Sequence, residues 1–164
     1  MKKIILFAVV FVFLFAAVGT VFAKGKSGAA GKSNVGHLYL YEKDSNDPNW
    51  AIVPNGAWGK MKYNLSGPTF DFVFNGHVLE PSTSYTLIYY PDPWPGTGLI
   101  CLGNAMSNEG GNVHIAGSVN TGSLTDAKIW LVLSSDCAAT TMTNWQPTEY
   151  LFENNLISYT AGGH

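Results

Sequence analysis

The chain has 164 residues, of which 46% are hydrophobic and 12% are charged, and its formal net charge is −2. It contains no arginine, the residue best suited to bidentate contacts with phosphates and guanine edges, so no nucleic-acid partner is expected. The sequence also has no phosphate-binding loop, dinucleotide fingerprint, serine nucleophile elbow or zinc-protease motif, and we therefore do not predict an enzyme.

Residues 1–23 are predicted to be a secretory signal peptide. Lys2 and Lys3 precede an unbroken apolar run, and the small side chains of Val21 and Ala23 fit a cleavage site after Ala23. The run is also long enough to cross a bilayer, so an uncleaved anchor is the alternative. Cleavage would leave a secreted protein, extracellular or at the cell surface, with no membrane span.

Residues 24–35 are predicted to form a flexible linker, because lysine, glycine, serine and alanine dominate them and no apolar period is present. Residues 36–159 are expected to form a single domain, which is long enough to bury a core. This domain has four lysines against eleven acidic residues. An acidic domain therefore follows a basic linker.

Alternation of apolar and polar residues with a period of two predicts strands throughout this domain. In TFDFVFN the alternation places Phe70, Phe72 and Phe74 on one face of a strand. The segment AKIWLVLSS, residues 127–135, is apolar on both faces, as expected for a central strand. Further strands are expected at residues 36–42, 57–66, 84–90, 98–103, 112–119 and 150–159.

Turn signals separate these segments, and no stretch of ten residues has a convincing helical period. A short helical turn is expected only within residues 138–148. The fold class is therefore predicted to be all-β: a single antiparallel β-sandwich of seven to nine strands, with immunoglobulin-like or jelly-roll-like layers. Its core is expected to include Phe70, Phe72, Phe74, Ile129, Leu131 and Leu133.

The segment DSNDPN offers a candidate metal site. Its oxygen-bearing side chains are of the kind that a hard cation such as calcium prefers. An ordinary turn is the alternative, because aspartate, asparagine and proline are also typical turn residues. The candidate calcium ligands are Asp44, Asn46, Asp47 and Asn49.

The segment YYPDPWPGTG, residues 89–98, has a proline at every second position around Trp94. Prolines lack an amide donor, so this segment is expected to run along an edge or rim of the sandwich. A tryptophan on such a rigid loop can form a stacking platform for a sugar or a partner protein. The ligand-binding residues predicted on this basis are Tyr90, Asp92, Trp94 and Asn104.

Two interpretations of this aromatic loop stay open. Trp50, Trp58 and Trp145 also lie near turns, and they could share a rim with Trp94. Alternatively, Trp94 folds back as a lid on the core, and the prolines protect an edge strand from pairing with other chains.

The two cysteines, Cys101 and Cys137, are predicted to form a disulfide, because thiols of an exported chain usually oxidise where geometry allows. Two separate buried thiols are the alternative. A catalytic cysteine is not favoured, since no histidine motif accompanies either residue.

Four segments carry a resemblance to known proteins: GHLYLYEKD, FNGHVLEPSTSYTLIYYPDPWPGTGLICLG, GGNVHIAGSV and AKIWLVLSSD. Together they resemble a group of secreted prokaryotic β-sandwich proteins with no assigned activity, over about residues 36–158. The resemblance implies a secreted all-β domain and carries no catalytic residue to this chain.

We therefore expect a secreted, non-enzymatic binding or surface-structural module, with an extracellular glycan or protein as its partner. One alternative is self-association in an extracellular assembly, in which residues 24–42 are donated as a strand to a neighbour. Another alternative is a secreted hydrolase, which would need two of the scattered carboxylates to converge at roughly 5–10 Å. No cofactor other than the candidate calcium ion is implied.

Overall fold

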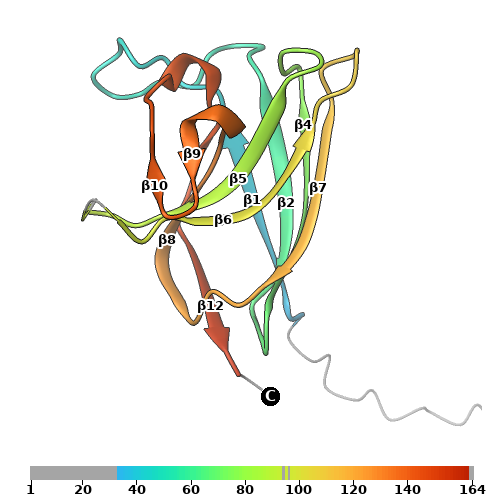
Figure 1. The fold of residues 1–164 in the computed structure, drawn as a ribbon, viewed down its shortest axis with the longest axis vertical. Coiled ribbons are helices and arrows are strands. Elements are labelled where there is room, and N and C mark those ends of the chain that lie inside the picture. Colours follow the sequence, from blue (N-terminus) through green and yellow to red (C-terminus); the bar gives the residue numbers. More distant parts are fainter. Residues whose placement is uncertain (1–32, 94, 96, 163–164) are drawn as a thin grey trace, which may run out of the picture. The chain divides into compact units, whose positions relative to one another are not determined.

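The computed structural model describes residues 33–93, 95 and 97–162. The predicted signal peptide, residues 24–32 of the predicted linker, and Trp94 lie outside these residues. Within the described part, the regular structure consists of twelve strands and two short 3-10 helices (Figure 1). Eight of the strands have five residues or more. The predicted all-β fold class is confirmed.

The first sheet has five strands in the order β11, β1, β2, β4, β7, and its pairs are antiparallel. Their side chains alternate between the interior and solvent, most regularly in β4, as the sequence predicts. The strands are β1 (Val35–Tyr41), β2 (Trp58–Asn64), β4 (Phe70–His77), β7 (Val113–Val119) and β11 (Phe152–Glu153).

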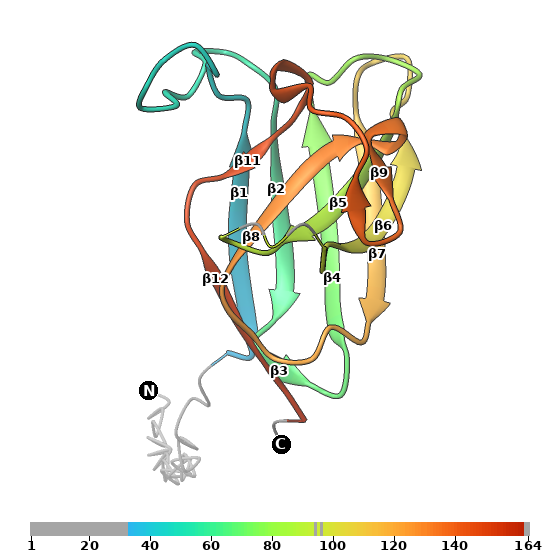
Figure 2. The ribbon, with the colours of Figure 1, turned by 60° about the vertical axis from the view of Figure 1, so that its left-hand side comes forward.

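The second sheet also has five strands, in the order β3, β12, β8, β5, β6. Figure 2 shows β8, β5 and β6 crossing obliquely in front of the first sheet. The strands are β3 (Ser66–Gly67), β5 (Ser84–Tyr90), β6 (Ile100–Met106), β8 (Leu124–Leu133) and β12 (Ile157–Ala161).

One pair in this sheet departs from the antiparallel prediction, since β3 runs parallel to β12 over two residues. The reason is local: β3 follows directly on β2 of the first sheet, and the hydroxyl of Tyr159 donates to the Gly67 carbonyl at 2.6 Å. This short edge pair joins the two sheets at one end of the sandwich.

The main core fills the space between the two sheets. The predicted core residues Phe70, Phe72, Phe74, Ile129 and Leu131 are buried there, while Leu133 is half-buried and packs against the same cluster. The ring of Phe74 occupies the space into which a Cβ at residue 59 would project, so the core approaches β2 closely at a glycine.

Strand β8 is buried on both faces, as expected for a central strand. Ile129 and Leu131 point into the main core, whereas Trp130 and Val132 belong to a second apolar cluster on the outer side of the second sheet. We call this second group the outer cluster. Its buried members are Ile88, Leu99, Trp130, Val132, Tyr150 and Phe152.

The segment after β8 covers part of this outer side. It contains the 3-10 helix η1 (Ser134–Asp136), the hairpin of β9 (Cys137–Ala138) with β10 (Thr141–Met142), and the 3-10 helix η2 (Pro147–Glu149). The short helical turn predicted within residues 138–148 corresponds only to η2. The preceding residues form the hairpin instead, because strands β9 and β10 pair with each other.

Candidate aromatic binding pocket

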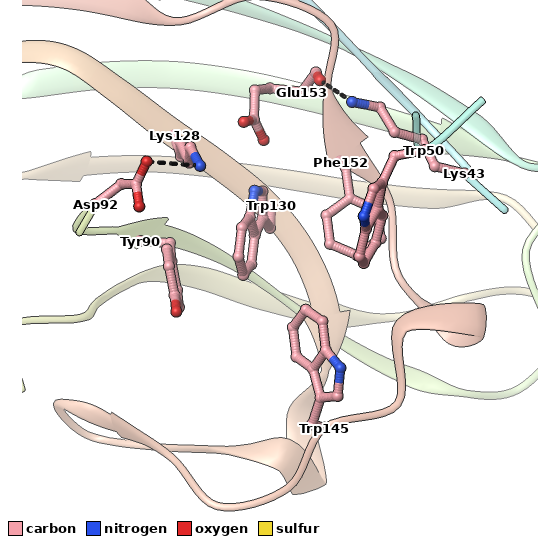
Figure 3. Close-up of a pocket in the computed structure, with 9 residues that line it drawn as sticks. All are labelled: Lys43, Trp50, Tyr90, Asp92, Lys128, Trp130, Trp145, Phe152 and Glu153. Atoms are coloured by element: carbon pink, nitrogen blue, oxygen red, sulfur yellow. Dashed lines mark hydrogen bonds and ion pairs between the residues drawn. The ribbon is translucent and has the colours of Figure 1, made fainter. Parts of the chain in front are cut away.

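A pocket of about 340 Å³ lies where the outer cluster opens to solvent (Figure 3). This volume falls at the lower end of the range for small-molecule sites, about 300–1,000 Å³. Five of its nine lining residues are aromatic, and the other four are charged. The lining residues are Lys43, Trp50, Tyr90, Asp92, Lys128, Trp130, Trp145, Phe152 and Glu153.

The innermost ring belongs to Trp130 of β8, which is only 7% exposed. Tyr90, at the end of the neighbouring strand β5, stacks on it with ring centroids 3.9 Å apart and planes 19° apart. Phe152 of β11 meets the same indole edge-on at 5.2 Å. The base of the pocket is therefore held by three strands and not by loops.

Trp50 forms one wall of the pocket, and a tight turn presents it. Its backbone has φ of 51°, a left-handed conformation that costs a non-glycine residue of order 1–3 kcal/mol. Its amide donates to the Asp47 carbonyl at 2.9 Å, and its ring meets Phe152 at 5.1 Å. A strained tryptophan backbone facing a pocket is the kind of outlier from which function can be inferred.

The same turn contains the candidate calcium ligands, and two of them have roles within it. Asp44 Oδ1 accepts hydrogen bonds from the backbone and side-chain nitrogens of Asn46, at 2.9 and 3.3 Å. Asp47 Oδ1 accepts from the Asn49 amide at 2.7 Å. These contacts are those of an ordinary turn, so the geometry gives the segment a role in presenting Trp50.

Trp145 forms an adjoining wall and is half-exposed. Its ring centroid lies 5.9 Å from that of Trp130 and 6.3 Å from that of Trp50. The next residue, Gln146, donates through Nε2 to both carboxylate oxygens of Asp136, at 2.9 and 3.1 Å. These two hydrogen bonds anchor the residue that follows Trp145.

Asp136 is the centre of that buried network, because only 1% of it is exposed. Its carboxylate also accepts from the Tyr150 hydroxyl at 2.5 Å and from the Ser135 hydroxyl at 2.9 Å. Burial, together with the hydrogen bond to Asp136, raises the pKa of Tyr150 well above its usual range. The network ties η1 to the segment that holds Trp145.

Two lysines on the pocket lining are already engaged. Lys128 Nζ forms an ion pair with Asp92 Oδ2 at 2.8 Å, and Lys43 Nζ donates to the backbone carbonyl of Glu153 at 2.8 Å. Because half of the Asp92 side chain is exposed, we expect this ion pair to contribute no more than about 1 kcal/mol to stability. Figure 3 shows both contacts on the side of the pocket away from Trp145.

Two buried polar atoms on the pocket lining have no hydrogen-bond partner among the described residues: Trp130 Nε1 and Glu153 Oε2. Leaving such a group unpaired costs about 1–3 kcal/mol. The indole nitrogen of Trp130 is on the side of its ring that faces the Glu153 carboxylate (Figure 3), although no hydrogen bond of standard geometry joins Nε1 to Oε2. Among the described residues the pocket lining therefore has one donor and one acceptor without a partner of standard geometry. The Trp130 indole is still close enough to Glu153 to lower the pKa of its carboxyl group.

The ionisation of Glu153 follows from this setting. Burial raises the pKa of its carboxyl group, while its own backbone amide, the Lys43 charge, the Trp130 indole and the Lys128 charge oppose the shift. At Tyr90, burial and the Asp92 charge raise the pKa of the phenol, and Lys128 opposes them.

Of the ligand-binding residues predicted from the sequence, Tyr90 and Asp92 line this pocket. Asn104, by contrast, is exposed on β6 and is not part of the lining, and Trp94 lies outside the described residues. Trp58 does not join the aromatic rim either, because its ring packs on His77 at 4.7 Å.

Sequence reasoning missed Trp130, Phe152 and Glu153 as site residues. Trp130 lies in an apolar strand that the sequence assigns to core, and Phe152 and Glu153 lie in a segment predicted only as a strand. The one available signal was the pairing of Trp130 with charged Lys128 on the same face of β8.

The two cysteines lie side by side as free thiols. Cys101 Sγ on β6 is 2.7 Å from Cys137 Sγ on β9, and the structure does not join them in a disulfide. Burial, followed by the contact with Cys101, raises the pKa of Cys137 to about 12. The two cysteines are therefore neighbours, as the prediction requires, but the disulfide bond itself is not formed in the structure.

Within the described part of the chain, no group of three or more histidine, cysteine, aspartate or glutamate side chains could hold a metal ion. No helix in that part has the length and apolar character needed to cross a membrane.

Comparison of the chain with protein-family models, with curated proteins and with solved structures finds no match.

Proposed function

We propose that this chain is an exported, non-catalytic binding module that holds a saccharide ring of an extracellular glycan in its aromatic pocket. The observation that carries the proposal is the set of rings around one small cavity. Trp50, Trp130 and Trp145 surround it together with Tyr90 and Phe152. Aromatic faces are good surfaces for stacking a sugar, and they lose little conformational entropy on binding.

The partly exposed rings support this proposal most directly. Trp145 is 50% exposed and Trp50 is 36% exposed, although each also packs against Phe152 within the pocket. Rings that were needed only for the core would be buried as Phe74 is. We infer that the exposed faces of these two tryptophans contact the ligand.

Export is the second part of the proposal, and it rests on the layout of residues 1–23. The protein released from a secreting host should begin at Lys24, which N-terminal sequencing would reveal. We also propose that Cys101 and Cys137 form a disulfide after export, because their sulfur atoms are already neighbours. An N-terminus at Met1 would contradict cleavage of the signal peptide.

The binding test uses the full chain produced by secretion and a panel of glycans, with affinity measured by calorimetry. We expect Trp145→Ala and Trp50→Ala to weaken binding about tenfold each, which corresponds to about 1.4 kcal/mol. Trp58→Ala is the matched control, since Trp58 is 37% exposed but lies outside the pocket lining.

Equal losses of affinity for Trp58→Ala and Trp145→Ala would contradict the assignment of the pocket. An absence of glycan binding by the wild-type protein would overturn the proposed function as a whole.

The two alternatives from the sequence have separate tests. A hydrolase would release the leaving group from a chromogenic glycoside, whereas the binding module releases none. A strand-donating subunit needs its first strand to be apart from its own sheet, but β1 pairs along its whole length with β2 and also with β11. The pairing of β1 favours the binding module over strand donation.

A further inference from the structure

Trp130 Nε1 and Glu153 Oε2 make a donor and an acceptor available on one side of the pocket. Both atoms are buried, and neither has a hydrogen-bond partner among the described residues. They are also the two such side-chain atoms in that part of the chain, so the main core contains none of this kind. Buried polar groups are normally hydrogen-bonded, so two unpaired polar atoms on a pocket lining indicate that a ligand could supply the missing hydrogen bonds.

We propose that one hydroxyl group of the ligand binds to both residues, accepting a hydrogen bond from Trp130 Nε1 and donating a hydrogen bond to Glu153 Oε2. This inference rests on the proposed function and specifies the ligand class: a neutral saccharide with a free hydroxyl on the edge that enters the pocket. The ring of the same sugar would lie against the exposed tryptophan faces.

The chemistry of the two atoms fits the other common ligand classes less well. A cation would satisfy the carboxylate but leave the indole N–H unpaired, and it would meet the lysines that line the pocket, Lys43 and Lys128. An anion would satisfy the indole but would be repelled by Glu153 and Asp92. A hydroxyl group is both donor and acceptor, and it satisfies the two atoms together.

The surrounding contacts leave these two atoms for the ligand. Lys43 Nζ is directed to the backbone carbonyl of Glu153, and Lys128 Nζ is paired with Asp92. The stack of Tyr90 on Trp130 and the edge contact of Phe152 hold the indole plane in place. Recognition is therefore preorganised, and a ligand lacking the hydroxyl should be rejected strongly.

The test follows the indole N–H signals of the five tryptophans by ¹H–¹⁵N NMR on the full chain produced by secretion. The Trp130 signal is assigned by its loss in Trp130→Phe. The probes are neutral methyl hexopyranosides, their deoxy derivatives, glucuronate and choline. We expect a saturable shift of the Trp130 signal with at least one neutral sugar, and at least tenfold weaker binding of glucuronate and choline.

Two variants address the bridge itself. Trp130→Phe keeps an aromatic ring without the donor, and Glu153→Leu removes the acceptor; each should lower the affinity for the neutral sugar at least tenfold. Trp58→Phe and Glu109→Gln are matched controls, because both positions are exposed and outside the pocket lining. The deoxy sugar that lacks the bridging hydroxyl should bind wild type and Glu153→Leu about equally.

The outcomes separate this inference from the function on which it rests. One outcome would overturn the hydroxyl bridge alone: neutral sugars bind and Trp145→Ala lowers their affinity, but Glu153→Leu leaves the affinity unchanged and the Trp130 indole signal does not shift. The proposed binding module would then stand. Tighter binding of choline or glucuronate would also overturn the bridge. If no sugar binds, the proposed function and the bridge are both overturned.

Discussion

The main core and the outer cluster are built on opposite faces of the same strand, β8, but they differ in how their polar groups are treated. In the main core two buried tyrosine hydroxyls are hydrogen-bonded: that of Tyr85 accepts from the Glu80 amide, and that of Tyr159 donates to the Gly67 carbonyl. In the outer cluster Trp130 Nε1 has no such partner among the described residues. Among the described residues, the outer face of β8 thus has a buried donor without a partner, Trp130 Nε1, and the main core has none.

The largest expected effect is on the free energy of unfolding, and it compares one aromatic ring of the main core with one ring of the pocket wall. Phe74 is fully buried between the sheets, so Phe74→Ala should lower the free energy of unfolding by about 3–5 kcal/mol. Trp145→Ala removes a half-exposed ring and should cost less than about 1 kcal/mol. Chemical denaturation of the two variants measures the difference. Similar losses would show that the pocket wall is part of the core.

The next effect concerns the link between β6 and the hairpin that precedes Trp145. A Cys101–Cys137 disulfide would close a loop of about 36 residues and stabilise the protein by about 3–4 kcal/mol relative to the reduced form. Thiol counting by mass spectrometry on the non-reduced exported protein checks the bond, and denaturation with and without reductant checks its contribution. Two free thiols in the exported protein would contradict the prediction.

Asp136 links Tyr150 of the outer cluster to Gln146, the residue after Trp145, through hydrogen bonds to its carboxylate. Asp136→Ala would leave the Tyr150 hydroxyl and the Gln146 amide without their acceptor, at an expected cost of about 1–3 kcal/mol. Because Gln146 adjoins Trp145, glycan affinity should fall as well. The affinity is measured below the unfolding temperature, with Ser135→Ala as the milder comparison. An unchanged affinity would show that Trp145 is positioned without Asp136.

The smallest expected effect is a pH dependence specific to the pocket. Since burial raises the pKa of Glu153, the native state holds this proton more tightly than the unfolded chain does. The resulting stabilisation is fully present below the unfolded pKa and is lost as pH rises through the folded pKa. Glu153→Gln removes that loss, so the variant should be more stable than wild type at neutral pH but not in acid.

Melting temperatures of wild type and Glu153→Gln across this pH range check the prediction. The difference between the two proteins is the relevant quantity, because other carboxyls titrate too. Hydrogen bonds from Ser118 and Thr69 lower the pKa of Asp71, for example, and this acts in the opposite direction in both proteins. A constant difference in melting temperature would contradict the role given to Glu153.

The all-β fold could be predicted from the sequence because apolar and polar residues alternate along its longer strands. The phenylalanines at 70, 72 and 74 and the continuous apolar run of β8 predicted which residues lie between the sheets, and the structure buries them there. Strands β9 and β10 were not predicted, and β3 and β11 were not separated from the longer strands predicted at residues 57–66 and 150–159. A two-residue strand leaves no periodic signal, whether its partner is distant, as β1 is for β11, or adjacent, as β10 is for β9.

Only some of the pocket residues could be predicted from the sequence. The prolines after Tyr90 indicated a rim, and Tyr90 and Asp92 do line the pocket. Trp130 and Glu153 could not be recognised, because their role depends on two strands far apart in sequence and on the absence of a hydrogen-bond partner. Local sequence does not encode either condition.

The late position of β11 and β12 in the chain limits when the two sheets can close during synthesis. β11 completes the first sheet beside β1, and β12 lies between β3 and β8 in the second, so neither sheet is complete before residues 152–161 have been synthesised. Pairings over such long separations form slowly. Phe152 and Glu153 can therefore reach the pocket only after nearly the whole domain has been synthesised.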